Sequence, residues 1–187
     1  MSRLAIETKL GLVEFKWSVE GRLKELHLNI EKENSNVIRT PRSMIASGQI
    51  PVSWLGFIDQ FVNYLETGIP VEPVSWDMID SRGWTEFQSA VYQSVAQIPI
   101  GETRGYKWVA EKIRNYSACR AVGQALKKNP LPVIVPCHRV ISSSGGIGGF
   151  LGKTETNDPE ILIKKLLLSI EDQYLNPPFP FLLKLQG

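Results

Sequence analysis

The sequence predicts a mixed α/β (α+β) chain in two parts, a small sheet-plus-helix domain over residues 1–85 and a mainly helical domain over residues 86–187. Three observations predict this division. Short β-rich runs precede one amphipathic helix in the first part. A segment rich in proline and turn residues, IPVEPVSWDMIDSRG, follows as a connection. Beyond it, apolar residues recur mostly at helical spacing. A chain of 187 residues can form one large domain or two small ones.

The β-rich runs GLVEFKWSV and LKELHLNI predict two strands, over residues 11–19 and 23–30. A polar stretch around residues 31–43 follows. The segment SWLGFIDQFVNYLETG predicts a helix that ends at Gly68. Its apolar residues recur at helical spacing, so one face is expected to pack on the preceding strands: Leu55, Ile58, Phe61, Val62 and Leu65.

The second part opens with a predicted helix, TEFQSAVYQSVAQIP, with Thr85 as its N-cap and Pro99 at its end. Two shorter helices are predicted over residues 106–115 and 119–129, separated by the turn NYSA. Such a pair is typical of a helix-turn-helix, whose second helix contacts DNA, although helix pairs of this length also serve as plain scaffold. In the second helix we expect four residues to be buried: Ala121, Val122, Ala125 and Leu126.

Charge is distributed unevenly along the chain. Residues 1–85 carry nine Lys and Arg against eleven Asp and Glu, whereas residues 86–187 carry twelve against eight. Residues 101–140 alone carry eight basic and two acidic side chains. This stretch indicates either a nucleic-acid partner or a solvated basic face. No run reaches the roughly 20 apolar residues of a membrane helix, and no secretory signal precedes the first strand, so we expect a cytoplasmic protein.

Small and basic residues share the predicted helix over residues 119–129. Small side chains allow a partner backbone to approach closely, and cations can meet phosphates; the alternative is that Gly123 and Ala125 only permit close helix packing. The candidate DNA-binding residues are Cys119, Arg120, Ala121, Gly123, Lys127 and Lys128.

The segment NPLPVIVPCHRVI brings a cysteine and a histidine together. Its three prolines exclude a helix, so we expect extended, buried backbone leading to Cys137. With only two cysteines in the chain, no disulfide framework is expected, and Cys137 is free to react. Neighbouring side chains on extended backbone point to opposite faces, so His138 is expected to reach the thiol through a bridging water. Arg139 can add a positive field.

A histidine that acts as a base needs a partner for its second nitrogen, commonly a carboxylate. The segment NDPEILIKKLLLSIED predicts a helix capped near Asp158, with Leu162, Leu166 and Ile170 on the core side. Glu171 can lean inward from the end of that face or be a solvated helix-end charge. The glycine-rich stretch SSSGGIGGFLG lies between His138 and this helix. It suits either a loop that wraps a flat ligand or a plain hairpin loop.

PCHRV, preceded by RAVGQALKKNP and followed by GIGGF, closely resembles the O6-alkylguanine-DNA alkyltransferases, which repair DNA by direct reversal. The resemblance covers roughly residues 86–171. It implies an RNase H-like N-terminal domain, a helix-turn-helix that enters the minor groove of double-stranded DNA containing O6-alkylguanine, and irreversible, single-turnover methyl transfer to Cys137. It further implies a monomer without metal or other cofactor, in the cytoplasm, or in the nucleus of a eukaryote.

The resemblance also implies a role for each matching residue. Cys137 is the alkyl acceptor, His138 the base and Glu171 the carboxylate that orients it. Asn129 braces the turn before the active site, Tyr106 assists the leaving guanine, and Arg120 fills the space vacated in the base stack. The pocket residues are Arg139, Val140, whose carbonyl would accept from the guanine amino group, Phe150 and Leu151. The last two replace the tyrosine and serine usual in the family, which puts substrate range in doubt.

Two other classes of protein remain open from the residues alone. A cysteine hydrolase also uses Cys, His and an acid, although it would leave the basic helix pair unexplained. A non-catalytic relative that only binds alkylated DNA would lack the acceptor, whereas Cys137 is present. Metal binding in the first part is not expected, because His27 is the only His or Cys there. The segment after residue 172 lies outside the resemblance and is expected to pack on the body of the protein or contact a partner.

Overall fold

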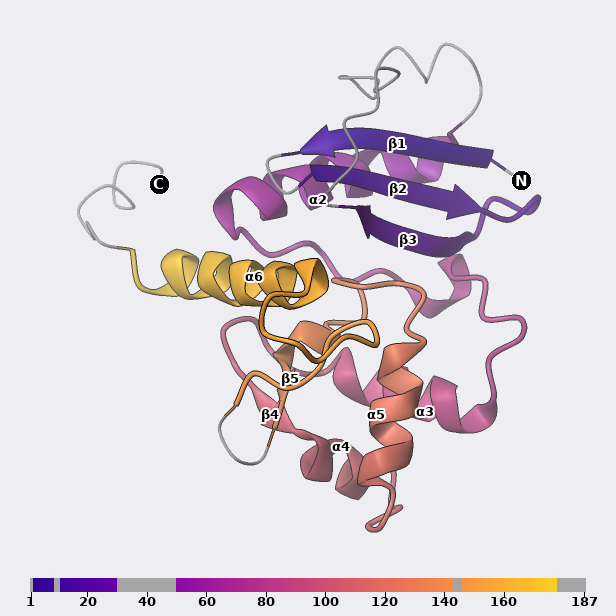
Figure 1. Cartoon of the computed structure of the whole chain (residues 1–187). Helices are drawn as coiled ribbons and strands as arrows, with labels where there is room; N and C mark the ends of the chain where they lie inside the picture. Colours follow the sequence, from indigo (N-terminus) through magenta and orange to yellow (C-terminus); the bar gives the residue numbers. More distant parts are fainter. Residues whose placement is uncertain (1, 9–10, 30–49, 143–145, 178–187) are drawn as a thin grey trace.

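The structure, a computed structural model, describes residues 2–8, 11–29, 50–142 and 146–177. A three-stranded sheet with α2 behind it forms one end of the molecule, α3, α4 and α5 form the other, and α6 lies across the middle (Figure 1). The main elements are β1 (Ser2–Thr8), β2 (Gly11–Trp17), β3 (Leu23–Asn29), α2 (Leu55–Thr67), α3 (Glu86–Val95), β4 (Arg104–Gly105), α4 (Tyr106–Lys112), α5 (Cys119–Lys127), β5 (Val140–Ile141) and α6 (Pro159–Leu175). Short 3-10 turns are η1 (Val52–Trp54), η2 (Trp76–Met78) and η3 (Cys137–Arg139).

The sheet is antiparallel in the order β1-β2-β3. Strands β2 and β3 confirm the two predicted runs, whereas β1 was not predicted. Only Leu4 and Ile6 of β1 are buried, so its alternating pattern is too short to predict a strand by itself. Pairing with β2 is what makes this segment a strand. Alternate residues on β2, among them Phe15, face the core.

Helix α2 packs on the sheet through aromatic side chains, as the edge-to-face contact of Phe15 with Phe61 shows, with ring centroids 5.2 Å apart. It ends as predicted at Gly68, which takes a left-handed φ of 77°. A Cβ at Gly68 would lie 2.5 Å from the backbone oxygen of Ile170. The glycine therefore allows α2 to approach α6, the helix that carries Glu171.

The helical end is built as the spacing of apolar residues predicts. Thr85 caps α3 in a reciprocal capping box with Gln88. Helices α4 and α5 pack on one another and on α3, and the hydroxyl of Tyr92 on α3 donates to the Ala125 carbonyl at 3.0 Å. Ala121 is exposed, so the expectation that it is buried is wrong. It lies on the outer face of α5, while Val122 and its neighbours one turn on form the inner face.

Helix α6 is rotated relative to the prediction. Ile170 is buried as expected, but Leu162 is 49% and Leu166 42% exposed. The inner face of α6 instead includes two buried charged residues, Lys164 and Glu171, which are held inside by polar partners. The rotation of this helix thus depends on those interactions as well as on the burial of apolar side chains.

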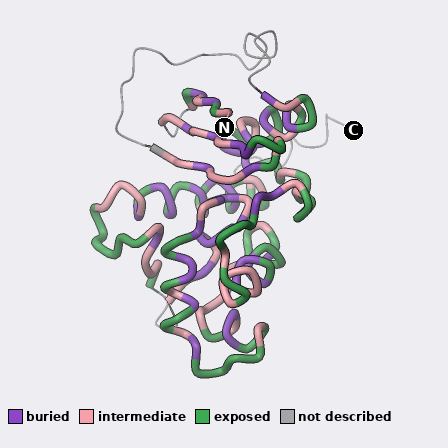
Figure 2. Tube along the Cα trace, turned by 90° about the vertical axis from the view of Figure 1, so that its right-hand side faces the viewer, coloured by how far each residue is buried: buried purple, intermediate pink, exposed green. Residues whose placement is uncertain are grey.

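Buried residues from the sheet end and the helical end form one hydrophobic cluster, and exposed stretches follow the outer turns (Figure 2). The domain boundary at residue 85 stays a prediction. Within the described ranges, no helix is long and apolar enough to cross a membrane. Nor does that part of the chain place three or more His, Cys, Asp or Glu side chains where they could hold a metal ion. The polar stretch 31–43 and residues 178–187 of the tail lie outside the described residues.

Candidate active site

Cys137 begins the 3-10 turn η3, directly after Pro136. The expectation of an extended approach to it is wrong, because a hydrogen bond from Val135 N to Leu131 O, 2.8 Å long, closes a tight turn. Val133 in this turn takes a φ of 75°, which is a strained conformation for a β-branched residue. A proline restricts its own backbone angles and those of the residue before it. Val133 follows Pro132 and is not followed by a proline, so its backbone is free to reverse the chain.

The side chain of Asn129 joins this turn to the thiol. Its Oδ1 accepts from Leu131 N at 3.0 Å, and its Nδ2 donates to Val135 O at 2.9 Å and to Cys137 Sγ at 3.2 Å. Asn129 is buried, so water does not compete for these bonds. Its amide therefore fixes the sulfur relative to the turn.

His138 and Glu171 form a buried pair, with 2.8 Å between His138 Nε2 and Glu171 Oε1 and neither side chain exposed. An ionised carboxylate only accepts hydrogen bonds, so Nε2 carries the hydrogen and Nδ1 keeps its lone pair. Nδ1 is buried and has no hydrogen-bond partner in the part of the chain that the structure describes. An imidazole nitrogen in this state can accept a proton from a nearby thiol or from a water bound to one.

Glu171 receives hydrogen bonds from four residues. Besides His138, Arg139 donates through Nη2 at 2.8 Å and Nε at 3.1 Å, Gly101 N donates at 3.1 Å, and the hydroxyl of Tyr64 donates at 2.7 Å. Burial favours the neutral acid, but the bonds from His138 and Arg139 outweigh burial and hold the pKa of Glu171 well below its usual range. The carboxylate therefore stays ionised beside the imidazole.

Burial raises the pKa of Cys137 to about 11, although the Asn129 bond and the nearby Lys164 charge act in the opposite direction. Burial also lowers the pKa of His138, against the effect of Glu171. At neutral pH the resting site thus holds a thiol and a neutral imidazole. A cysteine in this state can act as a nucleophile only after it loses its proton, because the thiolate is the reactive form.

Lys164 on α6 was not among the residues predicted from the sequence. Its side chain is fully buried, and its Nζ donates to Val140 O at 2.6 Å and to Gly149 O at 3.1 Å. Burial lowers its pKa to about 8, opposed by the charge of Cys137. The ammonium ties the segment after Cys137 to the glycine-rich loop. Its position two helical turns before Glu171, on the same face, is the sequence signal that could have identified it.

A cavity of about 290 Å³ opens in front of Cys137. Tyr106 and Gly123 line its helical side, and Phe150 and Leu151 line the opposite side. Ligand pockets commonly have volumes of about 300 to 1,000 Å³, so this one has room for a single small group.

The loop side of this cavity is an ordered turn. Phe150 and Lys153 exchange backbone hydrogen bonds of 3.0 and 2.9 Å, and the two residues between them, Leu151 and Gly152, have φ values of 46° and 89°. Positive φ at both central positions is typical of a type I′ turn. Within the glycine-rich stretch, residues 149–152 wall the cavity, whereas residues 143–145 lie outside the described residues.

Tyr106 reaches the cavity because β4 pairs in parallel with β5, with Arg104 opposite Val140. This pairing places the start of α4 beside the segment that follows Cys137. A Cβ at Gly148 would lie 3.4 Å from the Tyr106 hydroxyl oxygen, so the ring lies closely against the loop. Burial raises the pKa of Tyr106, with Cys137 as a smaller cause, so its hydroxyl keeps the proton.

The outer face of α5 lies next to this cavity. Gly123, Gln124 and Lys127 line the cavity wall, and five residues of α5 and its C-cap are exposed: Arg120, Ala121, Gln124, Lys127 and Lys128. A basic helix face with small side chains thus borders the opening to the thiol.

Comparison with known proteins matches residues 86–173 to the family model described as "6-O-methylguanine DNA methyltransferase, DNA binding domain". The methylated-DNA–protein-cysteine methyltransferase of Methanosarcina mazei is 36% identical over 130 residues, which are 68% of this chain and 78% of that protein. The chain belongs to this family. The constitutive enzyme of Bacillus subtilis is 46% identical over 92 residues, which are 49% of this chain and 52% of that protein.

Solved structures of the family share the fold, a small sheet combined with several helices. The Mycobacterium tuberculosis OGT in complex with DNA aligns with a TM-score of 0.67 and 30% identity, over 93% of this chain and 94% of that one. The M. tuberculosis O6-methylguanine methyltransferase aligns with a TM-score of 0.62 and 26% identity, over 97% of this chain and 99% of that one. The likeness therefore includes the sheet end as well as the residues of the family model.

Most of the residues predicted from the family pattern lie together. One group surrounds the thiol and its cavity: Tyr106, Asn129, Cys137, His138, Phe150, Leu151 and Glu171. Cys119 is half-buried at the start of α5. Val140 does not line the cavity, and its carbonyl oxygen accepts from Lys164. Arg139 does not line this cavity either. Its guanidinium binds Glu171 and donates to the Ile98 carbonyl at 2.7 Å.

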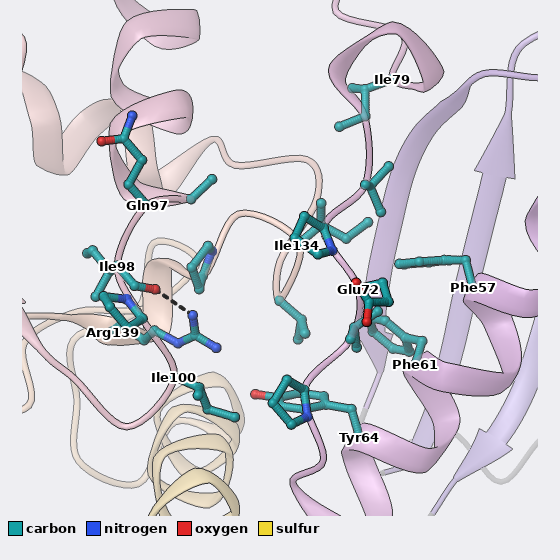
Figure 3. Close-up of a pocket in the computed structure, with 18 of the residues that line it drawn as sticks. Phe57, Phe61, Tyr64, Glu72, Ile79, Gln97, Ile98, Ile100, Ile134 and Arg139 are labelled. Carbon is teal, nitrogen blue, oxygen red and sulfur yellow. Dashed lines mark hydrogen bonds between the residues drawn. The ribbon is translucent and has the colours of Figure 1, made fainter.

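Arg139 instead borders a second cavity, of about 570 Å³, between α2 and the segment after α3. Figure 3 shows its guanidinium bound to Ile98, with Tyr64 approaching from α2. Tyr64 is the other functional candidate that was not predicted from the sequence. It looks like an ordinary core residue on an apolar helix face, and only the fold reveals that its hydroxyl meets Glu171.

Proposed function

We propose that this protein repairs O6-alkylguanine in double-stranded DNA by moving the alkyl group, in one irreversible turnover, to Cys137. The observation that carries the proposal is the thiol itself: Cys137 Sγ lies at a cavity wall, 3.2 Å from the Asn129 amide, in the residue next to a buried His138–Glu171 pair. This arrangement supplies a nucleophile, a base and a carboxylate that orients the base. Membership of the methyltransferase family supports the same reaction.

For DNA binding, we infer that α4 and α5 act as a helix-turn-helix, with α5 in the minor groove. The small residues Cys119, Ala121 and Gly123 let the helix approach the backbone, and Lys127 and Lys128 meet phosphates. Arg120, exposed at the start of α5, fills the space that the damaged nucleotide leaves. The sheet with α2 corresponds to an RNase H-like unit. The resemblance to the alkyltransferases further implies that the protein acts as a monomer.

The damaged base has to leave the helix, because its alkyl group cannot reach a protein thiol within a duplex. Extrusion costs on the order of a few kcal/mol and is cheapest for a weakly paired base. The 290 Å³ cavity receives the extruded base between the Tyr106 side and the Phe150 side. Cys137 then lies where the alkyl carbon arrives.

In the transfer step, the proton of the Cys137 thiol moves through a bridging water to Nδ1 of His138, and Glu171 stabilises the imidazolium. The sulfur forms a bond to the alkyl carbon while the bond between that carbon and guanine O6 breaks. The electron pair stays on the guanine, which takes up one proton with the help of Tyr106, whose hydroxyl is protonated at neutral pH. The products are a cysteine thioether and unmodified guanine, and the thioether cannot return to a thiol under mild conditions.

Intact-mass measurement tests this function. The wild-type chain is incubated with excess duplex DNA bearing O6-methylguanine, beside Cys137→Ala and an undamaged duplex. We expect the wild type to gain one methyl group and then stop, and the variant to gain none. Methyl loss from DNA that continues over many cycles would contradict single-use transfer and indicate a hydrolase. Binding without any mass gain would indicate a protein that only recognises alkylated DNA.

A further inference from the structure

The sheet end of the molecule contributes one polar group to the proposed active site. Tyr64 on α2 is 1% exposed, and its hydroxyl donates to Glu171 Oε1 at 2.7 Å. The hydroxyl oxygen of Tyr64 also lies 3.4 Å from His138 Nε2. The hydroxyl thus meets the contact between carboxylate and imidazole, although residue 64 is 74 positions before the histidine.

The direction of this hydrogen bond follows from its surroundings. Glu171 is ionised and can only accept, so the Tyr64 hydroxyl has to donate. Burial, together with the negative charge of Glu171, raises the pKa of Tyr64 well above its usual value, so the hydroxyl keeps its proton. Figure 3 shows the Tyr64 side chain extending from α2 toward Arg139, the other residue beside Glu171 that borders this cavity.

We propose that Tyr64 is a positioning residue of the transfer reaction, which holds Glu171 Oε1 against His138 and shares the carboxylate charge with the imidazole. The inference rests on the proposed function, since it assigns a role in that same reaction. A carboxylate bound by several donors attracts a proton on His138 less strongly than an isolated one. His138 therefore releases its proton more easily and stays neutral, and able to act as a base, to lower pH.

The charged and titratable groups that face His138 come from three elements. Among the described residues they are Glu171 and Lys164 from α6, Arg139 from η3, and Tyr64 from α2. Of these, Tyr64 alone belongs to the sheet end. The N-terminal part of the chain thus acts on the chemistry as well as on stability.

The test uses the full chain with Tyr64→Phe, which removes only the hydroxyl. The control is Tyr92→Phe, which removes another buried hydroxyl, bound to the Ala125 carbonyl instead of Glu171. Both variants are first compared with wild type by thermal unfolding, to separate loss of fold from loss of function. Methyl transfer from duplex O6-methylguanine is then timed from pH 5 to pH 9.

We expect Tyr64→Phe to fold and to transfer about three- to tenfold more slowly at neutral pH, as the loss of one hydrogen bond to the site implies. The acidic limb of its rate profile should move to higher pH. Tyr92→Phe should leave the position of that limb unchanged. Equal profiles for Tyr64→Phe and wild type, or an equal displacement in both variants, would overturn the proposal.

A second readout does not depend on activity. The chain contains only two histidines, His27 and His138, so an NMR titration of the imidazole protons can follow each, with His27→Gln to assign the signals. Tyr64→Phe should raise the titration midpoint of His138 and leave that of His27 unchanged. An unchanged midpoint of His138 would refute the role of Tyr64 even if methyl transfer is observed. A raised midpoint in a protein that transfers no methyl group would instead refute the proposed function.

Discussion

The side-chain amide of Asn129 donates a hydrogen bond of 3.2 Å to the sulfur of Cys137. Among the described residues, no other side chain donates to this thiol. The same side chain bonds Leu131 N and Val135 O. The turn that delivers the cysteine and the environment of its sulfur therefore depend on one residue.

Asn129→Ala should destabilise the protein by about 1–3 kcal/mol, because it leaves the Leu131 amide buried without its partner. It also removes one of the two donors to the Val135 carbonyl, which still accepts from Cys137 N. The pKa of Cys137 should rise further, since the Asn129 bond lowers it in the wild type. Chemical unfolding measures the first effect and thiol titration the second. A variant with wild-type stability and thiol pKa would contradict this role.

Stability at alkaline pH should show opposite contributions from Lys164 and Cys137. Burial lowers the pKa of Lys164 from 10.5 to about 8, so the unfolded chain binds more protons above pH 8 and the folded state gains stability as pH rises toward 10.5. Burial raises the pKa of Cys137 from 9.0 to about 11, so the folded state loses stability between those values.

Two variants separate these contributions. Compared with wild type from pH 8 to pH 11, Lys164→Met should lack the gain in stability and Cys137→Ala should lack the loss, each on the order of 1–3 kcal/mol. Unfolding by denaturant across this range measures both. Parallel curves for the two variants would show that neither group titrates as its burial implies.

Two glycines that both have a positive φ should respond differently to substitution by alanine. Gly68 and Gly83 have φ values of 77° and 91°, so a side chain costs about 1–2 kcal/mol at either position. At Gly68 the added Cβ would also lie 2.5 Å from Ile170 O, whereas at Gly83 no atom lies within 4 Å. Gly68→Ala should therefore lower the free energy of unfolding clearly more, and also slow methyl transfer by displacing α6. Equal losses of stability would show that α2 and α6 are not closely packed there.

Arg120→Ala should separate recognition of DNA from chemistry. Because Arg120 is exposed at the start of α5 and outside the cavity lining, its loss should slow methyl transfer from duplex DNA about tenfold or more, as stacking contributions of 1–3 kcal/mol imply. Transfer from the free O6-methylguanine base should keep its wild-type rate. A slower reaction with the free base would place Arg120 in the chemistry itself.

Local sequence patterns predicted much of this fold. Thr85 and Gly68 mark helix ends because capping depends on neighbouring residues alone. The turn before Cys137 was not predicted, since Asn129 stabilises it through bonds to residues up to eight positions away. The predicted rotation of α6 was wrong for a similar reason. Polar partners from other elements bury Lys164 and Glu171. A prediction from hydrophobicity alone placed Leu162 and Leu166 inside instead.

The candidate active site also contains residues that the sequence could predict and residues that it could not. Cys137, His138 and Glu171 could be predicted because the first two are adjacent and the family pattern supplies the third. Tyr64 could not, because its side chain is typical of a helix core and its partner lies 107 positions away. Lys164 was detectable by its spacing from Glu171, but a lysine on a helix is usually exposed.

The most direct test of the central claim is to locate the transferred group. Duplex DNA with an isotopically labelled methyl on guanine O6 is mixed with the protein, which is then digested, and the peptides are analysed by mass spectrometry. We predict one labelled thioether per chain at Cys137 and an unlabelled Cys119 in the same digest. Label on Cys119, or label released as methanol with Cys137 unchanged, would contradict the account.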